Sequence, residues 1–197
     1  MSAGGRLLVL DTATREAVVG VAEPDGSLVA VERWTAGYRH GEELVTRIEA
    51  ALDAAATTLR GLGGIVVGTG PGAFTGLRVG IATAKGLAHA AALPIAGVST
   101  GEALLRAATA QAGGAALVLL LPAGPSDRVL CRPGTVPRLL AGGEEPLLEP
   151  GELVAAIDLE GRAGDDALRR GAAVRDRLPQ ALATLGAERL SAGGDDL

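Results

Sequence analysis

The sequence predicts an α/β protein in which three antiparallel strands are followed by alternating helices and strands. Three features indicate this class: short apolar runs between turn residues at the start of the chain, apolar residues at helical spacing from Glu42 onward, and a glycine-rich loop that joins a buried strand to a second helix. The predicted order is strand, strand, strand, helix, strand, helix, strand, helix, with one more strand after it. Such alternation is typical of a sheet that is covered by helices.

The start of the chain contains three apolar runs that we interpret as a meander of antiparallel strands. These runs are Leu7–Leu10, Ala17–Ala22 and Ser27–Glu32. The dipeptide Asp25-Gly26 lies between the second and third runs, and it is a strong signal for a hairpin turn. We therefore expect three strands to open the first sheet.

The first predicted helix begins at Glu42, after His40 and Gly41, and it stops before Gly61. Its apolar residues recur at helical spacing and form a wide face. They are Leu44, Val45, Ile48, Ala51, Leu52, Ala55 and Leu59. Trp34 and Tyr38 precede the helix, and we expect them to anchor its entry in the core.

The alternation continues through the middle of the chain. Gly64–Val67 is predicted as a buried strand, and Leu77–Ala92 as a helix rich in Gly and Ala that ends before Pro94. A strand at Ile95–Val98 follows, and then a helix that reaches about Gln111. Either Ser99 or Thr100 can cap the start of this helix.

The pattern weakens after a very apolar strand at Ala115–Leu121. The following segment, Pro122–Pro150, is rich in Pro and Gly, and Leu168–Leu185 is predicted as a helix before an end, Gly193–Asp196, that is expected to fray. We divide the chain into a first lobe, residues 1–112, and a smaller, divergent second lobe, residues 113–197.

The composition excludes several classes of function. The 197 residues carry a net charge of −5, so the chain lacks the basic surface of a protein that holds nucleic acid by itself. A single cysteine, Cys131, excludes an internal disulfide. No signal peptide and no membrane-spanning run is recognised, so the cytoplasm is the expected location.

The glycine-rich loop, residues 68–80, does not match the known nucleotide-binding loops. Its last loop glycine, Gly76, is followed by Leu77-Arg78 rather than by the Lys-Ser/Thr pair of a phosphate-binding loop. Two interpretations stay open: a structural turn that packs the following helix on the sheet, or a contact for another macromolecule. Arg78 can bind a carboxylate across an interface or cap carbonyls of the loop.

Asp11, at the end of the first strand, is the first candidate for chemistry. The predicted element order is shared by ribonuclease-H-like domains and by the halves of actin-like ATPases, in which an Asp at this place precedes a turn that approaches the nucleotide phosphates. Here Ala13 occupies that turn, and its Cβ crowds the approach. We interpret Asp11 as a strand-end residue that is hydrogen-bonded in the region of Thr12 or Thr14, so that any nucleotide site at Asp11 and Thr12 is vestigial. A small actin-like ATPase or kinase acting alone is the alternative.

Metal and nucleophilic chemistry are poorly supported. The chain has only two histidines, His40 and His89, so a zinc peptidase site is not expected, and we expect His89 to pack among alanines. No base is recognisable near Cys131, which we interpret as a half-buried structural residue. We expect neither a metal nor a cofactor.

Four segments together resemble the bacterial TsaB (YeaZ) family. They are Leu8–Thr14, Gly68–Gly80, Ala84–Ala88 and Leu93–Thr100, in the same order as in the family. The resemblance is strong over residues 6–105. After the strand that ends at Leu121, the family usually has Asp-Ala-Arg and Glu-Val-Tyr motifs, which this chain lacks.

The resemblance implies an actin-like fold that has lost its nucleotide site and performs no chemistry itself. It implies a partner, TsaD, which is the metal- and ATP-binding subunit, and the ATPase TsaE. With these, a threonylcarbamoyl group is transferred to N6 of the adenosine beside the anticodon of tRNA, so contact with tRNA is expected only through the complex. The resemblance also allows a homodimer when TsaD is missing.

The two N-terminal helices and the glycine-rich loop are the predicted partner-binding surface, because small and apolar side chains permit close helix packing. The alternative is that these helix faces only cover the sheet. The candidate residues are Leu44, Ile48, Leu52, Gly72, Phe74, Thr75, Arg78, Gly80, Ala84, Leu87 and Ala91.

Overall fold

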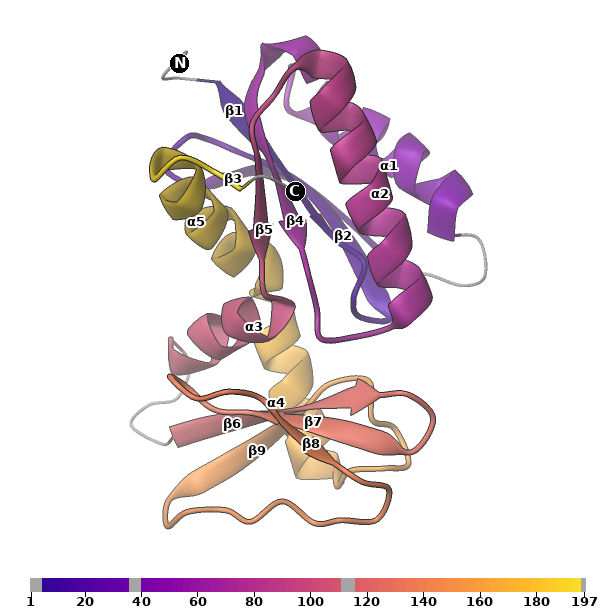
Figure 1. Cartoon of the computed structure of the whole chain (residues 1–197), viewed down its shortest axis with the longest axis vertical. Coiled ribbons are helices and arrows are strands. Elements are labelled where there is room, and N and C mark those ends of the chain that lie inside the picture. Colours follow the sequence, from indigo (N-terminus) through magenta and orange to yellow (C-terminus); the bar gives the residue numbers. More distant parts are fainter. Residues whose placement is uncertain (1–4, 36–39, 111–115, 196–197) are drawn as a thin grey trace.

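The computed structural model describes residues 5–35, 40–110 and 116–195, which form two sheets and the helices that cover them (Figure 1). The first sheet has the order β3-β2-β1-β4-β5. Its first three strands are antiparallel neighbours, and β4 and β5 run parallel to β1. The strands are β1 (Arg6–Asp11), β2 (Glu16–Ala22), β3 (Leu28–Thr35), β4 (Leu62–Gly68) and β5 (Ile95–Val98).

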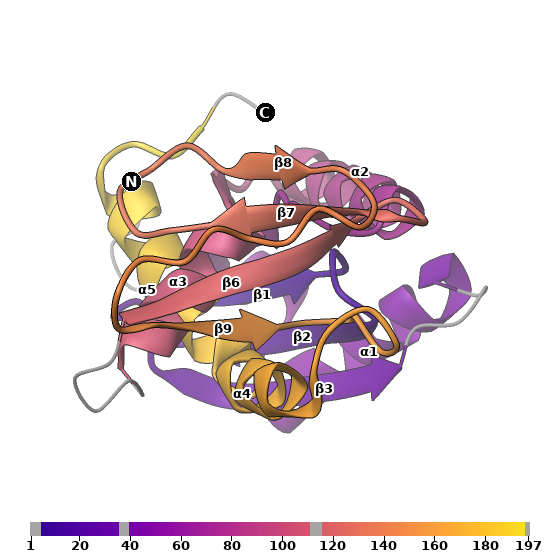
Figure 2. The ribbon, with the colours of Figure 1, turned by 90° about the horizontal axis from the view of Figure 1, so that it is seen from below.

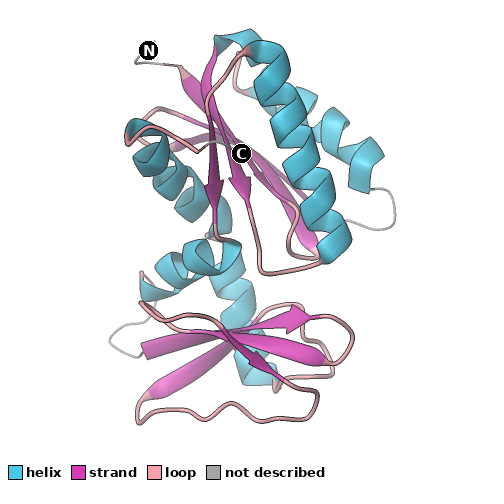
Figure 3. Cartoon of the chain, viewed as in Figure 1, coloured by secondary structure: helices cyan, strands magenta, loops and turns pink. Residues whose placement is uncertain are grey.

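Helices cover both faces of this first sheet. The helices α1 (His40–Ala54) and α2 (Phe74–Ala91) lie side by side on one face, and α5 (Leu178–Ser191) lies on the other (Figures 1 and 3). Because successive side chains of a strand point to opposite faces, β1 contributes Leu8 and Leu10 to the core under α1 and α2 and Val9 to the core under α5. A short 3₁₀ turn, η1 (Leu59–Gly61), leads into β4.

The second sheet has the order β8-β7-β6-β9 and lies across the other end of the molecule (Figure 2). The strands β6 and β9 are parallel, whereas β7 is antiparallel to both β6 and β8. The strands are β6 (Ala116–Ala123), β7 (Asp127–Cys131), β8 (Arg138–Leu140) and β9 (Glu152–Ala156), and the helices next to them are α3 (Thr100–Thr109) and α4 (Asp165–Arg175). The core under α5 continues through α3 to one face of this sheet, so the two sheets share a core.

Three local expectations are wrong. The helix predicted at Leu168–Leu185 is two helices, α4 and α5, and Pro179 stands in the first turn of α5, where a missing N–H costs nothing. The first helix ends at Ala54 instead of reaching Leu59. The chain end does not fray up to Asp195, since its N–H donates to Ile95 O (2.9 Å) and its carboxylate accepts from Gly97 N (2.7 Å).

The division into residues 1–112 and 113–197 stays a prediction. The chain leaves the first sheet after α3, but α5 returns to it and packs against β1, β4 and β5. The C-terminal helix therefore belongs to the layers of the first lobe in space, although it follows the second sheet in sequence.

Candidate functional site

Asp11 is fully buried at the end of β1, where each carboxylate oxygen has a partner. Oδ2 accepts a hydrogen bond from the Thr100 hydroxyl (2.7 Å), and Oδ1 accepts one from Ala13 N (2.9 Å). Burial raises the pKa of Asp11 from 3.8 to about 6; these hydrogen bonds oppose that rise and the charge of Asp158 adds to it. The side chain is thus held inside the protein, and its oxygens are occupied by the chain itself.

The glycine-rich loop packs directly on the turn between β1 and β2. Ala73 N donates to Ala13 O (2.7 Å), and the Thr12 hydroxyl donates to Gly76 O (2.7 Å). A Cβ on Gly72 would lie 2.1 Å from Ala13 O, so only glycine permits this approach. The turn residues from Asp11 to Thr14 are at most 3% exposed. The chain's own loop therefore fills the space beside the turn.

The start of α3 holds the loop from its other side. Gly70 N donates to the Thr100 hydroxyl (3.0 Å), while the Ser99 hydroxyl donates to Gly70 O (3.1 Å). Ser99 also caps α3 by accepting from Glu102 N. Gly70 has a φ of +87°, which favours glycine. These contacts support the structural interpretation of the loop, and its role as a contact for a macromolecule stays a prediction.

A second strand-end aspartate, Asp158, connects the two lobes through its side-chain contacts. It follows β9, and its carboxylate accepts from Arg15 N (2.6 Å) and pairs with Arg175 (3.2 Å). Arg175 also lies 3.9 Å from Glu16, a residue of β2. We did not single out Asp158 from the sequence, although the available signal was the same as for Asp11: an Asp directly after a buried apolar run.

The predicted partner-binding residues divide into two groups. Five of them face the first sheet and are buried: Leu44, Ile48, Leu52, Gly80 and Ala84. The sheet covers the centre of the apolar stripe, and the part of these five residues in partner binding stays a prediction. Gly72, Leu87 and Ala91 are half-buried.

The remaining candidates are exposed at the start of α2. Phe74 is 70% exposed, and the Arg78 guanidinium stacks over its ring with 5.0 Å to the centroid. Thr75 lies beside them on the surface. On α1 a large apolar residue, Val45, is 51% exposed; it belongs to the predicted stripe but points away from the sheet. Whether this surface binds a partner stays a prediction.

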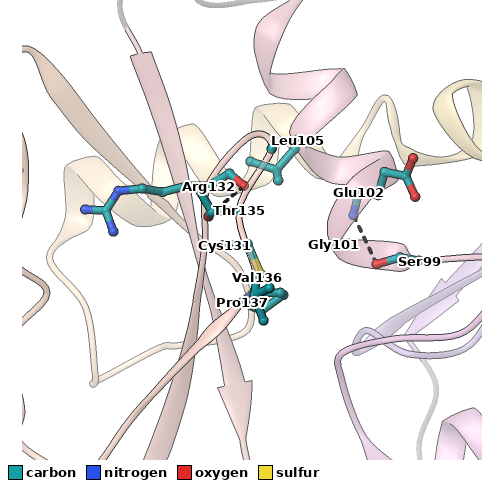
Figure 4. Close-up of a pocket in the computed structure, with 10 residues that line it drawn as sticks. Ser99, Gly101, Glu102, Leu105, Cys131, Arg132, Thr135, Val136 and Pro137 are labelled. Carbon is teal, nitrogen blue, oxygen red and sulfur yellow. Dashed lines mark hydrogen bonds between the residues drawn. The ribbon is translucent and has the colours of Figure 1, made fainter.

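A pocket of about 420 Å³ lies between the start of α3 and the turn after β7, and Cys131 lines it (Figure 4). Cys131 is buried, and burial raises the pKa of its thiol to about 11, so the nucleophilic thiolate is disfavoured. Figure 4 shows the Arg132 guanidinium directed away from the pocket, and it pairs with Glu152 (2.7 Å). The carboxylate that lines this pocket, Glu102, pairs with Arg189 (2.8 Å).

Of the two histidines, only His89 has a described side chain. His89 is exposed near the end of α2 and does not pack among alanines as expected, because its face of the helix points to solvent. The side chain of His40 and the whole of Tyr38 lie outside the described residues. Within the described ranges, no group of three or more His, Cys, Asp or Glu side chains is placed to hold a metal ion. No helix there is long and apolar enough to cross a membrane.

Comparison with protein families gives a match over residues 34–141, more than half of the chain, to the family described as "TsaD: tRNA N6-adenosine threonylcarbamoyltransferase". An uncharacterized protein of Mycobacterium tuberculosis is 41% identical over 99 residues, covering 50% of this chain and 47% of the relative. The "tRNA threonylcarbamoyladenosine biosynthesis protein TsaB" of Escherichia coli is 37% identical over 95 residues, covering 48% of this chain and 40% of the relative. The chain spans about half the length of the curated relatives that it matches.

Solved structures show a similar fold. "YeaZ from Pseudomonas aeruginosa" superposes with a TM-score of 0.61 and 25% identity, covering 73% of this chain and 70% of that chain. A second Pseudomonas aeruginosa structure, described as similar to "peptidase YEAZ", has a TM-score of 0.63, 26% identity and coverage of 74% and 70%. The predicted α/β, actin-like fold and the predicted likeness to TsaB and YeaZ are confirmed.

Proposed function

The chain belongs to the family described as "TsaD: tRNA N6-adenosine threonylcarbamoyltransferase", and from this premise we propose that it is a non-catalytic subunit in the synthesis of tRNA N6-threonylcarbamoyladenosine. In this proposal it binds a catalytic TsaD subunit and supports threonylcarbamoyl transfer to the adenosine beside the anticodon. Its likeness to TsaB and YeaZ supports the subunit role over that of the transferase itself.

One observation carries the non-catalytic part of the proposal. The β1–β2 turn, where an actin-like ATPase brings its backbone close to phosphates, is covered here by the glycine-rich loop, with Gly72 against Ala13. Asp11 is buried with both oxygens occupied. A nucleotide would have to displace this loop from the core to reach the turn, which would expose buried backbone groups.

The outer surface of α1 and α2 is the part of the first lobe that we assign to the partner. Phe74 is a large apolar side chain at the surface, and aromatic and arginine side chains such as Phe74 and Arg78 are enriched in protein interfaces. Val45 adds an exposed apolar side chain on the neighbouring helix. The buried residues below, Leu44 and Ile48 among them, hold the helices on the sheet and set the shape of this surface.

The test is a reconstituted modification assay with tRNA, ATP, threonylcarbamoyl donor, cognate TsaD and TsaE, with and without this chain. We expect modified adenosine to form at least about ten-fold faster when the chain is present, a change that corresponds to a modest coupling energy. Equal rates with and without the chain would contradict the proposal.

The alternative function is a small ATPase or kinase that acts alone, and it predicts phosphate release by the purified chain. We expect no ATP hydrolysis by the chain with Mg²⁺, because Asp11 and the turn behind it are not accessible. Turnover that is lost in an Asp11→Asn variant would favour the enzyme instead.

Four further parts of the proposal follow from the same surface and family. TsaE joins through the complex, tRNA is contacted through TsaD, and the chain works in the cytoplasm where tRNA is modified. When TsaD is absent, the outer surface of α1 and α2 forms a homodimer. Sedimentation of the purified chain measures this: a dimer that dissociates on Val45→Glu supports the proposal, and a monomer at high concentration contradicts it.

A further inference from the structure

A pocket in the second lobe carries two guanidinium groups that pair with no carboxylate among the described residues. Its volume is about 670 Å³, and Arg128 and Arg162 both line it, together with Ser126, Gly142, Gly143 and Glu145. The pocket is distinct from the Asp11 region and from the outer surface of α1 and α2. Nothing in the proposed function uses it.

The burial of Arg128 is the main observation. This β7 residue is only 6% exposed, and charged side chains at such burial are normally paired with an opposite charge. Its NH1 and NH2 groups donate only to backbone carbonyls, those of Arg162 (3.3 Å) and Glu144. No ion pair of Arg128 is found within the described residues. Carbonyl dipoles offset only part of a full positive charge, and Arg cannot lose its proton to avoid the cost.

Arg162 repeats the same pattern at the wall of the pocket. Its NH1 group donates to Gly124 O (3.3 Å) and Pro125 O (3.0 Å), and it too forms no ion pair in the part of the chain that the structure describes. The neighbouring arginines differ. Arg138 pairs with Glu144 (2.6 Å) and Arg132 with Glu152 (2.7 Å). Arg170 and Arg177 also form no ion pair among the described residues, but Arg170 is half-buried, Arg177 is exposed, and neither lines the pocket. The pocket is thus where a buried and a half-buried guanidinium group without an ion pair lie together.

The pocket also lies where ligands are bound in sheets of this kind. The strands β6, β8 and β9 run in the same direction, so the turns that follow them meet at one end of the second sheet. These turns supply Pro125, Gly143 and Arg162 to the pocket. The carboxyl ends of parallel strands are the usual place of ligand crevices in open α/β sheets.

The acidic groups around the pocket are only partly engaged. Asp127 Oδ1 accepts from the Ser126 hydroxyl (3.1 Å) and from Gly142 N (3.0 Å). Glu145 is exposed and lines the pocket without an ion pair among the described residues. The negative charge of Glu145 repels an anion and so lowers the affinity of the pocket for it. Replacing Glu145 by a neutral residue should therefore strengthen anion binding, whereas replacing either arginine should weaken it.

We propose that this pocket binds the oxyanion group, phosphate or carboxylate, of a small solute between Arg128 and Arg162. Guanidinium groups match both oxyanions with paired N–H donors, and a bound oxyanion supplies the counter-charge that Arg128 lacks. The proposal does not depend on the proposed role in tRNA modification.

The experiment is thermal unfolding of the full chain in low millimolar inorganic phosphate, with chloride of equal ionic strength as reference and acetate as a second arm. At ten times the dissociation constant, phosphate or acetate is expected to raise Tm by about 3–6 °C in a saturable manner. A larger response to phosphate assigns a phosphate ligand, and a larger response to acetate assigns a carboxylate ligand.

Two variants remove the site, one strengthens it and one is the control. Arg128→Met and Arg162→Gln should abolish the saturable shift, and Glu145→Gln should increase it. Arg138→Met should keep it, because that arginine is paired outside the pocket. If Arg128→Met does not fold, Arg162→Gln decides. No saturable shift in the native chain, or a shift that survives Arg162→Gln unchanged, would overturn the proposal.

Discussion

The two sheets differ at the carboxyl ends of their parallel strands: one of these ends is covered by a loop, and the other borders an open pocket. In the first sheet, the turn after β1 is covered by the glycine-rich loop, and the carboxylate of Asp11 has both oxygens engaged. In the second sheet, the turns after β6, β8 and β9 surround an open pocket lined by Arg128 and Arg162, which form no ion pair within the described ranges. Strand ends of one fold type can thus be closed or open, and the connecting loops decide which.

The closed end depends most strongly on Gly72. A methyl group there meets Ala13 O at 2.1 Å and pushes the loop off the turn, so we expect Gly72→Ala to lower the free energy of unfolding by at least about 3 kcal/mol. Gly86→Ala is the matched control, because a Cβ at that α2 position has no neighbour within 4 Å. It should stabilise by about 0.5–1 kcal/mol. Urea denaturation measures both, and equal stability of the two variants would show that the loop does not need the close approach.

The buried acid of the closed end makes a pH-dependent prediction. Since the pKa of Asp11 is raised from 3.8 to about 6, the stability that its neutral form provides is complete below pH 4 and is lost as the pH rises through 6. We expect Asp11→Asn to match the native chain at pH 4 and to be more stable by roughly 2–3 kcal/mol at pH 7. The measurement is denaturant unfolding of both proteins from pH 4 to 7.5. A difference that does not change with pH would contradict the buried, neutral-favouring environment.

Asp158 connects the second lobe to the turn between β1 and β2, and we expect its substitution to change stability less than the two changes above. Asp158→Asn keeps the shape and tolerates the φ of +57° but weakens the bonds to Arg15 N and Arg175, so we expect a loss of about 1–2 kcal/mol. It should also lower the pKa of Asp11, because one repelling charge is removed. Asp166→Asn is the control, since its pair with Arg169 is exposed and should be worth about 0.5 kcal/mol or less. Equal losses in the two variants would mean that Asp158 does not join the lobes.

Much of the first lobe could be predicted from the sequence, because its elements carry clear periodicity. The runs Leu7–Leu10 and Ala17–Ala22 lie within β1 and β2, and the helix after Ser99 begins where a cap was expected. In the second lobe the apolar run Ala115–Leu121 predicted β6, but the other strands could not be predicted, since β8 has three residues and β7 is interrupted by Arg128. Short strands in a segment rich in Pro and Gly have too few residues to show alternation.

The candidate surface shows the same limit. Helical spacing identified an apolar stripe on α1, but a stripe that wide does not reveal which of its residues the sheet covers: Ile48 lies inside, and Val45 lies outside. Asp158 and Arg128 were not singled out, because their importance comes from what the fold brings near them. Asp158 matters because its carboxylate contacts Arg15 of the other lobe. Arg128 is unusual because it is buried without an ion pair among the described residues, and the sequence shows neither its burial nor its neighbours.

The central claim is that the first lobe is closed to nucleotide and acts through the outer surface of α1 and α2. Its most direct test is calorimetric titration of cognate TsaD into this chain, with Val45→Glu and Phe74→Ala as surface variants and Ala172→Glu, at an exposed position of α4, as the matched control. The account predicts saturable binding by the native chain, weakened at least about ten-fold by each surface variant and unchanged by the control. Binding of equal strength in all four proteins, or no binding by the native chain, would contradict it.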